Sequence, residues 1–186
     1  MGARHPEGQD NLTSEPETKE ERIRSPAKAF WLFIAKTLVI IAALYVIGEY
    51  VLTPQRITGN GMSPFVRDGD LGIFYHLGKP RTGEVVLYKD SDGKVKPGRI
   101  AAVGGQEVDF PEEGGYTVDG YAPNEEITYE THPANDGPTY PLTVPEEEYF
   151  ILNDFRQMTD DSRQEGCIKK SQIIGTLELL FRRRDF

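Results

Sequence analysis

The residue types that most often do chemistry in proteins are sparse in this chain and are not spaced as metal or disulfide sites. Cys167 is the only cysteine in 186 residues, which excludes an internal disulfide and a cysteine-rich metal site. His5, His76 and His132 are scattered and lack the short spacing of paired metal ligands. We therefore expect neither a metal nor another cofactor.

Three segments, taken in order, combine glycine, proline and charged residues in a recurring pattern. The first, residues 57–70, reads Ile-Thr-Gly-Asn-Gly-Met-Ser-Pro and closes with Gly-Asp. The second comprises residues 82–86 and 98–105, and the third, residues 144–166, contains Asn-Asp-Phe-Arg-Gln-Met-Thr-Asp-Asp-Ser-Arg. Together they resemble the boxes of the type I signal peptidase family, the membrane-anchored serine proteases that cleave leader peptides from exported proteins.

The matching residues lie mainly in the first and third boxes. They are Gly59, Met62, Pro64, Gly69 and Asp70 in the first, and Asp154, Arg156, Asp161, Ser162 and Arg163 in the third. The resemblance covers residues 56–180. It implies a mainly β, mostly antiparallel fold behind a single N-terminal membrane anchor, and it implies peptide substrates bound as an added strand.

The resemblance implies a Ser-Lys dyad, but neither side chain is present. Serine is a poor nucleophile, so the neighbouring lysine must be neutral, with a pKa lowered by desolvation, to accept its proton. Met62 and Pro64 set the register that places Gly61 at the nucleophile position, and Arg99 places Gly98 at the lysine position. Glycine can do neither task, so we expect the chain to be catalytically silent.

Ser63 and Lys96, each two residues from a lost position, are the alternative dyad. A side chain two residues further along a strand lies on the same face of the sheet but is displaced by roughly 6.6 Å, which is beyond hydrogen-bond reach of the original site. Pro97 is also expected to disturb the strand between Lys96 and Gly98. A displaced dyad would make the chain an active signal peptidase.

The remaining box residues have structural or binding roles by the same resemblance. Thr159 stands where the family has a serine that orients the lysine, and Phe155 replaces an asparagine. Asp161 and Arg163 are expected to form an ion pair that braces their loop. The expected peptide groove comprises Asn60, Gly61, Met62, Pro64, Gly98, Arg99 and Thr159.

An apolar run from Phe30 to Leu52 predicts the membrane anchor, which we place at residues 29–53. As a helix, the run measures roughly 34 Å, enough to cross a hydrocarbon core. Residues 1–28 are polar and mixed in charge, which predicts a disordered cytoplasmic tail. Basic residues precede the run, so residues 54–186 are expected to be extracytoplasmic.

In this part of the chain, runs of β-branched and aromatic residues bounded by turn residues predict short strands at residues 72–77, 84–89, 98–103, 107–110 and 148–152. Within it, residues 107–148 carry twelve Asp and Glu residues and no Lys or Arg. We interpret this block as a solvated acidic flap, with a docking face for a basic partner as the alternative. The net charge of −9 argues against a nucleic-acid partner.

These observations predict a catalytically inactive signal peptidase homologue in the cell membrane. The resemblance extends to a subgroup that assists sortase-built pili in Gram-positive bacteria, so the expected partners are the membrane and an exported protein or pilin segment. The alternatives are an active signal peptidase that uses Ser63 and Lys96, and a relic or regulatory subunit.

Overall fold

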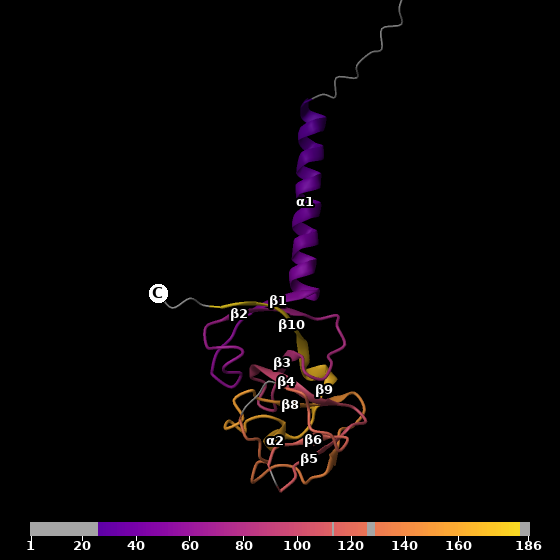
Figure 1. Ribbon diagram of the computed structural model, residues 1–186. Coiled ribbons are helices and arrows are strands. Elements are labelled where there is room, and N and C mark those ends of the chain that lie inside the picture. Colours follow the sequence, from indigo (N-terminus) through magenta and orange to yellow (C-terminus); the bar gives the residue numbers. More distant parts are fainter. Residues whose placement is uncertain (1–25, 113, 126–128, 183–186) are drawn as a thin grey trace, which may run out of the picture. The chain divides into compact units, whose positions relative to one another are not determined.

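The computed structural model describes residues 26–112, 114–125 and 129–182, and its first element is the helix α1, Pro26–Tyr50 (Figure 1). Its 25 residues extend about 37 Å. Proline suits the first turn of a helix, because the N–H that it lacks has no partner there. None of the helix residues is buried, and apolar side chains such as Trp31, Val39 and Leu44 are exposed. In length and composition, this helix is consistent with a membrane anchor.

The boundaries of α1 differ by a few residues at each end from those predicted for an anchor. The predicted tail includes Pro26–Lys28, which are helical, and the predicted anchor includes Leu52 and Thr53, which begin a strand. The predicted tail otherwise falls on residues 1–25, which lie outside the described residues. Hydropathy marks only the apolar run and does not locate the first and last turns of the helix, so the predicted and observed boundaries differ.

The rest of the described chain is mainly antiparallel β-sheet (Figure 1). The larger sheet has the strand order β1-β2-β10-β3-β4-β8-β9, and every neighbouring pair is antiparallel. Its strands are β1 (Leu52–Arg56), β2 (Leu71–Tyr75), β10 (Ile173–Phe181), β3 (Val85–Lys89), β4 (Val95–Val103), β8 (Glu148–Leu152) and β9 (Ile168–Lys169). The mainly β fold class is therefore confirmed.

A smaller sheet is formed within the acidic block. It has the order β6-β5-β7, with β6 at Thr117–Val118, β5 at Glu107–Asp109 and β7 at Leu142–Thr143. Two short helices complete the described elements, α2 (Ser162–Glu165) and the 3₁₀ turn η1 (Lys170–Gln172).

The five predicted strands are all present, as β2, β3, β4, β5 and β8, but β1, β10 and the two-residue strands β6, β7 and β9 were not predicted. β10 pairs with both β2 and β3, and its register shifts between Ile173 and Gly175 and again between Leu177 and Leu179. Such bulges break the period-2 alternation that identifies a strand in a sequence. β1 contains Pro54, which an edge strand tolerates because one side of it has no partner strand.

The acidic block is more tightly integrated than a solvated flap would be. Val108, Tyr116 and Val144 are buried and pack in one cluster with Ala101, Ala102, Phe150 and Leu152 of the larger sheet. A Cβ at Gly137 would overlap the carbonyl oxygen of Arg163. The block therefore shares a core with the sheet and is not a separate outer flap.

Cys167 should react slowly with thiol reagents. It packs half-buried against this cluster, and burial raises the pKa of its thiol from 9.0 to about 11. Because only the thiolate reacts, iodoacetamide at pH 8 should alkylate native Cys167 about 100-fold more slowly than the unfolded chain. Mass spectrometry should show the native rate rising steeply between pH 8 and pH 11. A native rate equal to the unfolded one would contradict this packing.

Candidate functional site

The loop that carries the first box is held against the loop that follows β8. The amide of Phe155 donates to the carbonyl of Gly61 at 2.8 Å, and the amide of Ser63 donates to the carbonyl of Asn60 at 3.0 Å. Met62 is buried and anchors the loop in a core cluster that includes Ile57. These contacts fix the direction in which a side chain at position 61 would point.

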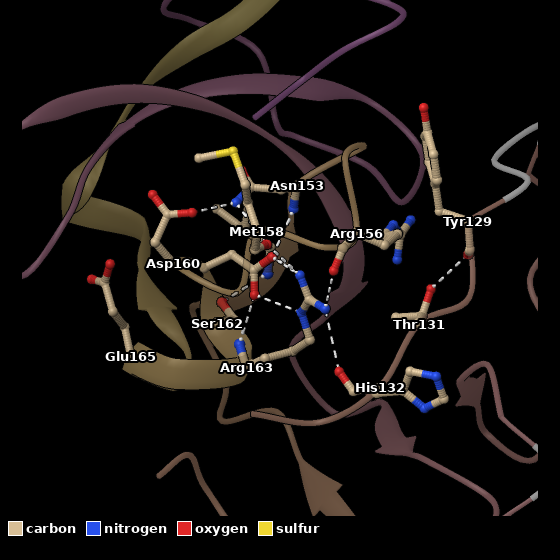
Figure 2. A network of polar contacts seen from close by, with 12 residues as sticks. Tyr129, Thr131, His132, Asn153, Arg156, Met158, Asp160, Ser162, Arg163 and Glu165 are labelled. Atoms are coloured by element: carbon tan, nitrogen blue, oxygen red, sulfur yellow. Dashed lines mark hydrogen bonds and ion pairs between the residues drawn. The ribbon is translucent and has the colours of Figure 1, made fainter. Parts of the chain in front are cut away.

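That direction is occupied by Asn153. A Cβ at Gly61 would lie 2.9 Å from Asn153 Oδ1 and 3.3 Å from its Cγ. The carboxamide is held in place, since its Nδ2 donates to Asp160 Oδ1 at 2.9 Å and to the Met158 carbonyl at 3.3 Å (Figure 2). The space beside Gly61 is therefore filled by an ordered polar group.

Gly98 lies within β4, opposite Val86 of β3, and the space beside it is also filled. A Cβ there would overlap Ile151 Cγ2 and would lie 3.0 Å from Cε1 of Tyr88. Ile151 and Tyr88 are fully buried. Ile151 and Asn153 are two residues apart at the end of β8, so one short segment takes the volume at both glycine positions.

The sequence motifs point to Gly61 and Gly98 but not to their neighbours Asn153 and Ile151. A signal for Asn153 was present, because the third box begins with glycine in the family pattern and with Asn153 here. Nothing in the sequence identifies Ile151, since a buried strand residue has no motif of its own.

Lys96 does not have the surroundings of a general base. Its ammonium lies 2.8 Å from Glu165 Oε1 and 3.5 Å from Asp90 Oδ2, and it donates to the Asp160 carbonyl at 2.7 Å. Burial lowers the pKa of Lys96, but the hydrogen bond to Glu165 and the charges of the nearby carboxylates outweigh burial and raise it above 10.5. Lys96 is therefore held in the protonated form, which cannot accept a proton from serine.

Ser63 is not among the hydrogen-bond partners of Lys96 within the described residues. Lys96 lines a cavity of about 700 Å³ together with Thr58, whereas Pro64, next to Ser63, lines a different cavity of about 610 Å³. Contrary to expectation, Pro97 does not interrupt β4. Pairing of β4 with β8 begins only at Arg99, so one side of Pro97 has no partner strand that would need its missing N–H.

The residues expected to form one groove are distributed over several environments. Pro64 and Arg99 line the 610 Å³ cavity, and Thr159 lines another of about 430 Å³ with Arg156. Met62 and Gly98 are buried, while Asn60 and Gly61 lie in the loop against Asn153. The structure thus brings Gly61 together with the third box but does not join all seven residues in one cavity.

The charged residues of the first and third boxes brace the loops. Asp154 accepts two hydrogen bonds from Arg99, at 2.7 and 2.6 Å, and Arg156 donates to both oxygens of Glu125 at 2.8 Å. In the first box, Asp70 is buried and accepts from the amide of Arg67. Gly69 adopts a φ of 87°, a left-handed conformation that favours glycine.

The third box is organised around Arg163 and Asp161 (Figure 2). The Arg163 guanidinium donates to both Asp161 oxygens, at 2.9 and 2.7 Å, and both side chains are buried. It also donates to the backbone carbonyls of His132, Arg156 and Met158. Ser162 Oγ accepts the amide of Ile151 at 2.9 Å, which ties this loop to the end of β8.

Comparison with known proteins identifies the scaffold. Residues 30–182 match the family model described as signal peptidase, peptidase S26. The chain is 26% identical over 170 residues to signal peptidase IB of Staphylococcus aureus, covering 80% of this chain and 87% of the relative. It is 29% identical over 181 residues to the probable signal peptidase I-2 of Synechocystis, covering 89% of this chain and 78% of the relative.

Among solved structures, the chain matches a signal peptidase I from Enterococcus faecalis with a TM-score of 0.45 and 24% identity, over 54% of this chain and 98% of the other. The family match extends from the apolar helix to the end of β10, and so covers the elements that hold all three boxes. The chain belongs to the signal peptidase family, peptidase S26.

Proposed function

We propose that this chain is a membrane-anchored, catalytically silent signal peptidase homologue that holds extended segments of exported proteins and assists their assembly at the cell surface. The assemblies we propose are sortase-built pili. In this proposal α1 is the single membrane span, the N-terminus is cytoplasmic and the β domain is extracytoplasmic.

The observation that carries the proposal is the state of the two dyad positions. Gly61 and Gly98 stand where the family pattern has its nucleophile and its base, and Asn153, Ile151 and Tyr88 occupy the space beside them. Lys96, the alternative base, is held in its charged form by ion pairs with Glu165 and Asp90. These contacts favour a scaffold adapted to a role other than cleavage.

Binding of an extended peptide remains feasible at β4. Residues 95–98 pair with β3 on one side, and pairing with β8 on the other side begins at Arg99. Val95 and Lys96 line the 700 Å³ cavity, so this side of the strand lies beside open space. An added strand binds through main-chain hydrogen bonds and needs no nucleophile, although Pro97 offers only its carbonyl.

A cleavage assay separates this proposal from the active enzyme. Full-length protein in detergent micelles, incubated with a fluorogenic leader peptide, should release product no faster than buffer, because Gly98 has no amine and Lys96 is held in the protonated form. A signal peptidase that cleaves the same peptide serves as the positive control. A photo-crosslinking version of the peptide should still label the protein, and unlabelled peptide should compete.

The variants Ser63→Ala and Lys96→Ala are the matched test of the displaced dyad. We expect both to behave as the unmodified chain does, without measurable cleavage. Product release that either substitution abolishes would establish an active peptidase and end the proposal. Absence of both cleavage and crosslinking would favour a relic or regulatory subunit instead.

A further inference from the structure

The 610 Å³ cavity beside the first box has lining residues from six separate parts of the chain. They include Phe65 and Arg67 of the loop after Gly61, Arg99 of β4, Tyr129, and Arg182, which follows β10. Neither Gly61 nor Gly98 lines this cavity. Its content of charged and aromatic groups indicates what it could bind.

The two carboxylates that line the cavity, those of Asp154 and Glu125, each have an arginine as their ion-pair partner. Asp154 accepts both of its hydrogen bonds from Arg99, whose guanidinium carries the compensating charge. Glu125 receives two hydrogen bonds from Arg156 and one from the Tyr116 hydroxyl at 3.1 Å. Neither carboxylate is left over to bind a cation.

Arg67 and Arg182 supply the uncompensated charge. Both are exposed, and neither forms a salt bridge within the described residues. Among the described residues, the cavity lining therefore includes two arginines without an ion-pair partner, on a chain whose net charge is −9. At physiological ionic strength, charges more than about 8 Å apart are largely screened, so these two guanidinium groups dominate locally.

Aromatic rings provide the apolar part of the cavity. Phe65 is 43% exposed, and the Arg99 guanidinium lies 4.9 Å from its ring centre. Tyr129 packs edge-on against Phe155, with ring centres 5.3 Å apart. A ligand that combines a carboxylate with an aromatic or aliphatic side chain would satisfy both features.

We propose that this cavity binds an acidic segment of the exported client, with carboxylates paired to Arg67 and Arg182 and an adjacent apolar side chain packed on Phe65 and Tyr129. The inference rests on the proposed peptide-binding function. It adds a chemical preference for the client that strand addition at β4 does not supply.

The test compares two labelled peptides on the full-length chain in phosphatidylcholine nanodiscs. One is Gly-Ser-Glu-Phe-Glu-Leu-Ser-Gly, and the other has both glutamates replaced by glutamine. Fluorescence anisotropy should show about fivefold tighter binding of the acidic peptide, because two partly exposed ion pairs contribute modestly. The double variant Arg67→Gln/Arg182→Gln should abolish that preference, while the matched control Arg56→Gln, an exposed arginine of β1 outside the cavity, should retain it.

The outcomes separate this inference from the function on which it rests. Equal binding of the acidic and neutral peptides would overturn the acidic preference and leave peptide binding intact. Binding of neither peptide would overturn both. If the double variant left the preference unchanged but reduced binding to phosphatidylglycerol vesicles, the arginines would contact lipid and the inference would be wrong. If the double variant changed only the oligomeric state, the inference would also be wrong.

Discussion

Replacing Gly98 with alanine should destabilise the β domain by about 1–3 kcal/mol, although the change adds a single methyl group. The new Cβ would overlap Ile151 Cγ2 and press on the ring of Tyr88, and both residues are fully buried. Neither can move into solvent, so the strain must be taken up by the packing of β3, β4 and β8. Urea denaturation of the full-length chain in detergent, followed by far-UV circular dichroism, measures the loss.

A double-mutant cycle with Ile151→Ala provides the control. Ile151→Ala alone should cost about 2–5 kcal/mol, because it leaves a cavity in the core. Combined with Gly98→Ala, the total loss should be at least 1 kcal/mol smaller than the sum of the single losses, since the truncated side chain makes room for the new methyl group. Strict additivity would mean that Ile151 does not fill the space beside Gly98.

The same crowding bears on position 98, which the resemblance assigns to the family's lysine. The Cβ of a lysine at residue 98 would overlap Ile151, and the rest of its side chain would have to pass Tyr88. A serine at residue 61 would meet Asn153 Oδ1. Placing these two side chains would therefore require changes at Ile151 of β8 and at Asn153, the residue that follows β8.

The sequence predicted those parts of the fold that depend on local pattern. The apolar run from Phe30 identified α1, and clusters of β-branched and aromatic residues identified β3, β4 and β8. β10 was missed because two bulges disturb its alternation, although it lies between β2 and β3 in the larger sheet. Non-local pairing of this kind leaves no periodic signal in the strand itself.

For the site, the sequence located positions but not their neighbours. The registers of Met62 and Arg99 pointed to Gly61 and Gly98. Two of the groups that fill the adjacent space, Ile151 of β8 and Asn153 just after it, lie more than fifty residues along the chain from Gly98. The environment of Lys96 was likewise unpredictable, because Glu165 reaches it from α2. Contacts between distant segments are set by tertiary packing, which a single sequence does not display.

Replacing Arg163 with alanine should have the largest effect on stability, a loss of about 3–5 kcal/mol. The substitution would leave the Asp161 carboxylate buried without its counter-ion, and three backbone carbonyls, those of His132, Arg156 and Met158, without their donor (Figure 2). An uncompensated buried charge is expensive because water cannot replace the lost partner. Urea denaturation under the conditions used for Gly98→Ala measures the change.

Two further variants show whether the loss arises from this network or from removing any arginine. Arg81→Ala removes an exposed arginine that has no salt bridge within the described residues, so it should change stability by less than about 0.5 kcal/mol. Arg163→Lys keeps the charge beside Asp161 but cannot reach three carbonyls at once, and we expect an intermediate loss. If Arg163→Ala were as mild as Arg81→Ala, the third box would not depend on this buried pair. If Arg163→Lys were as severe as Arg163→Ala, the carbonyl contacts would outweigh the charge pairing.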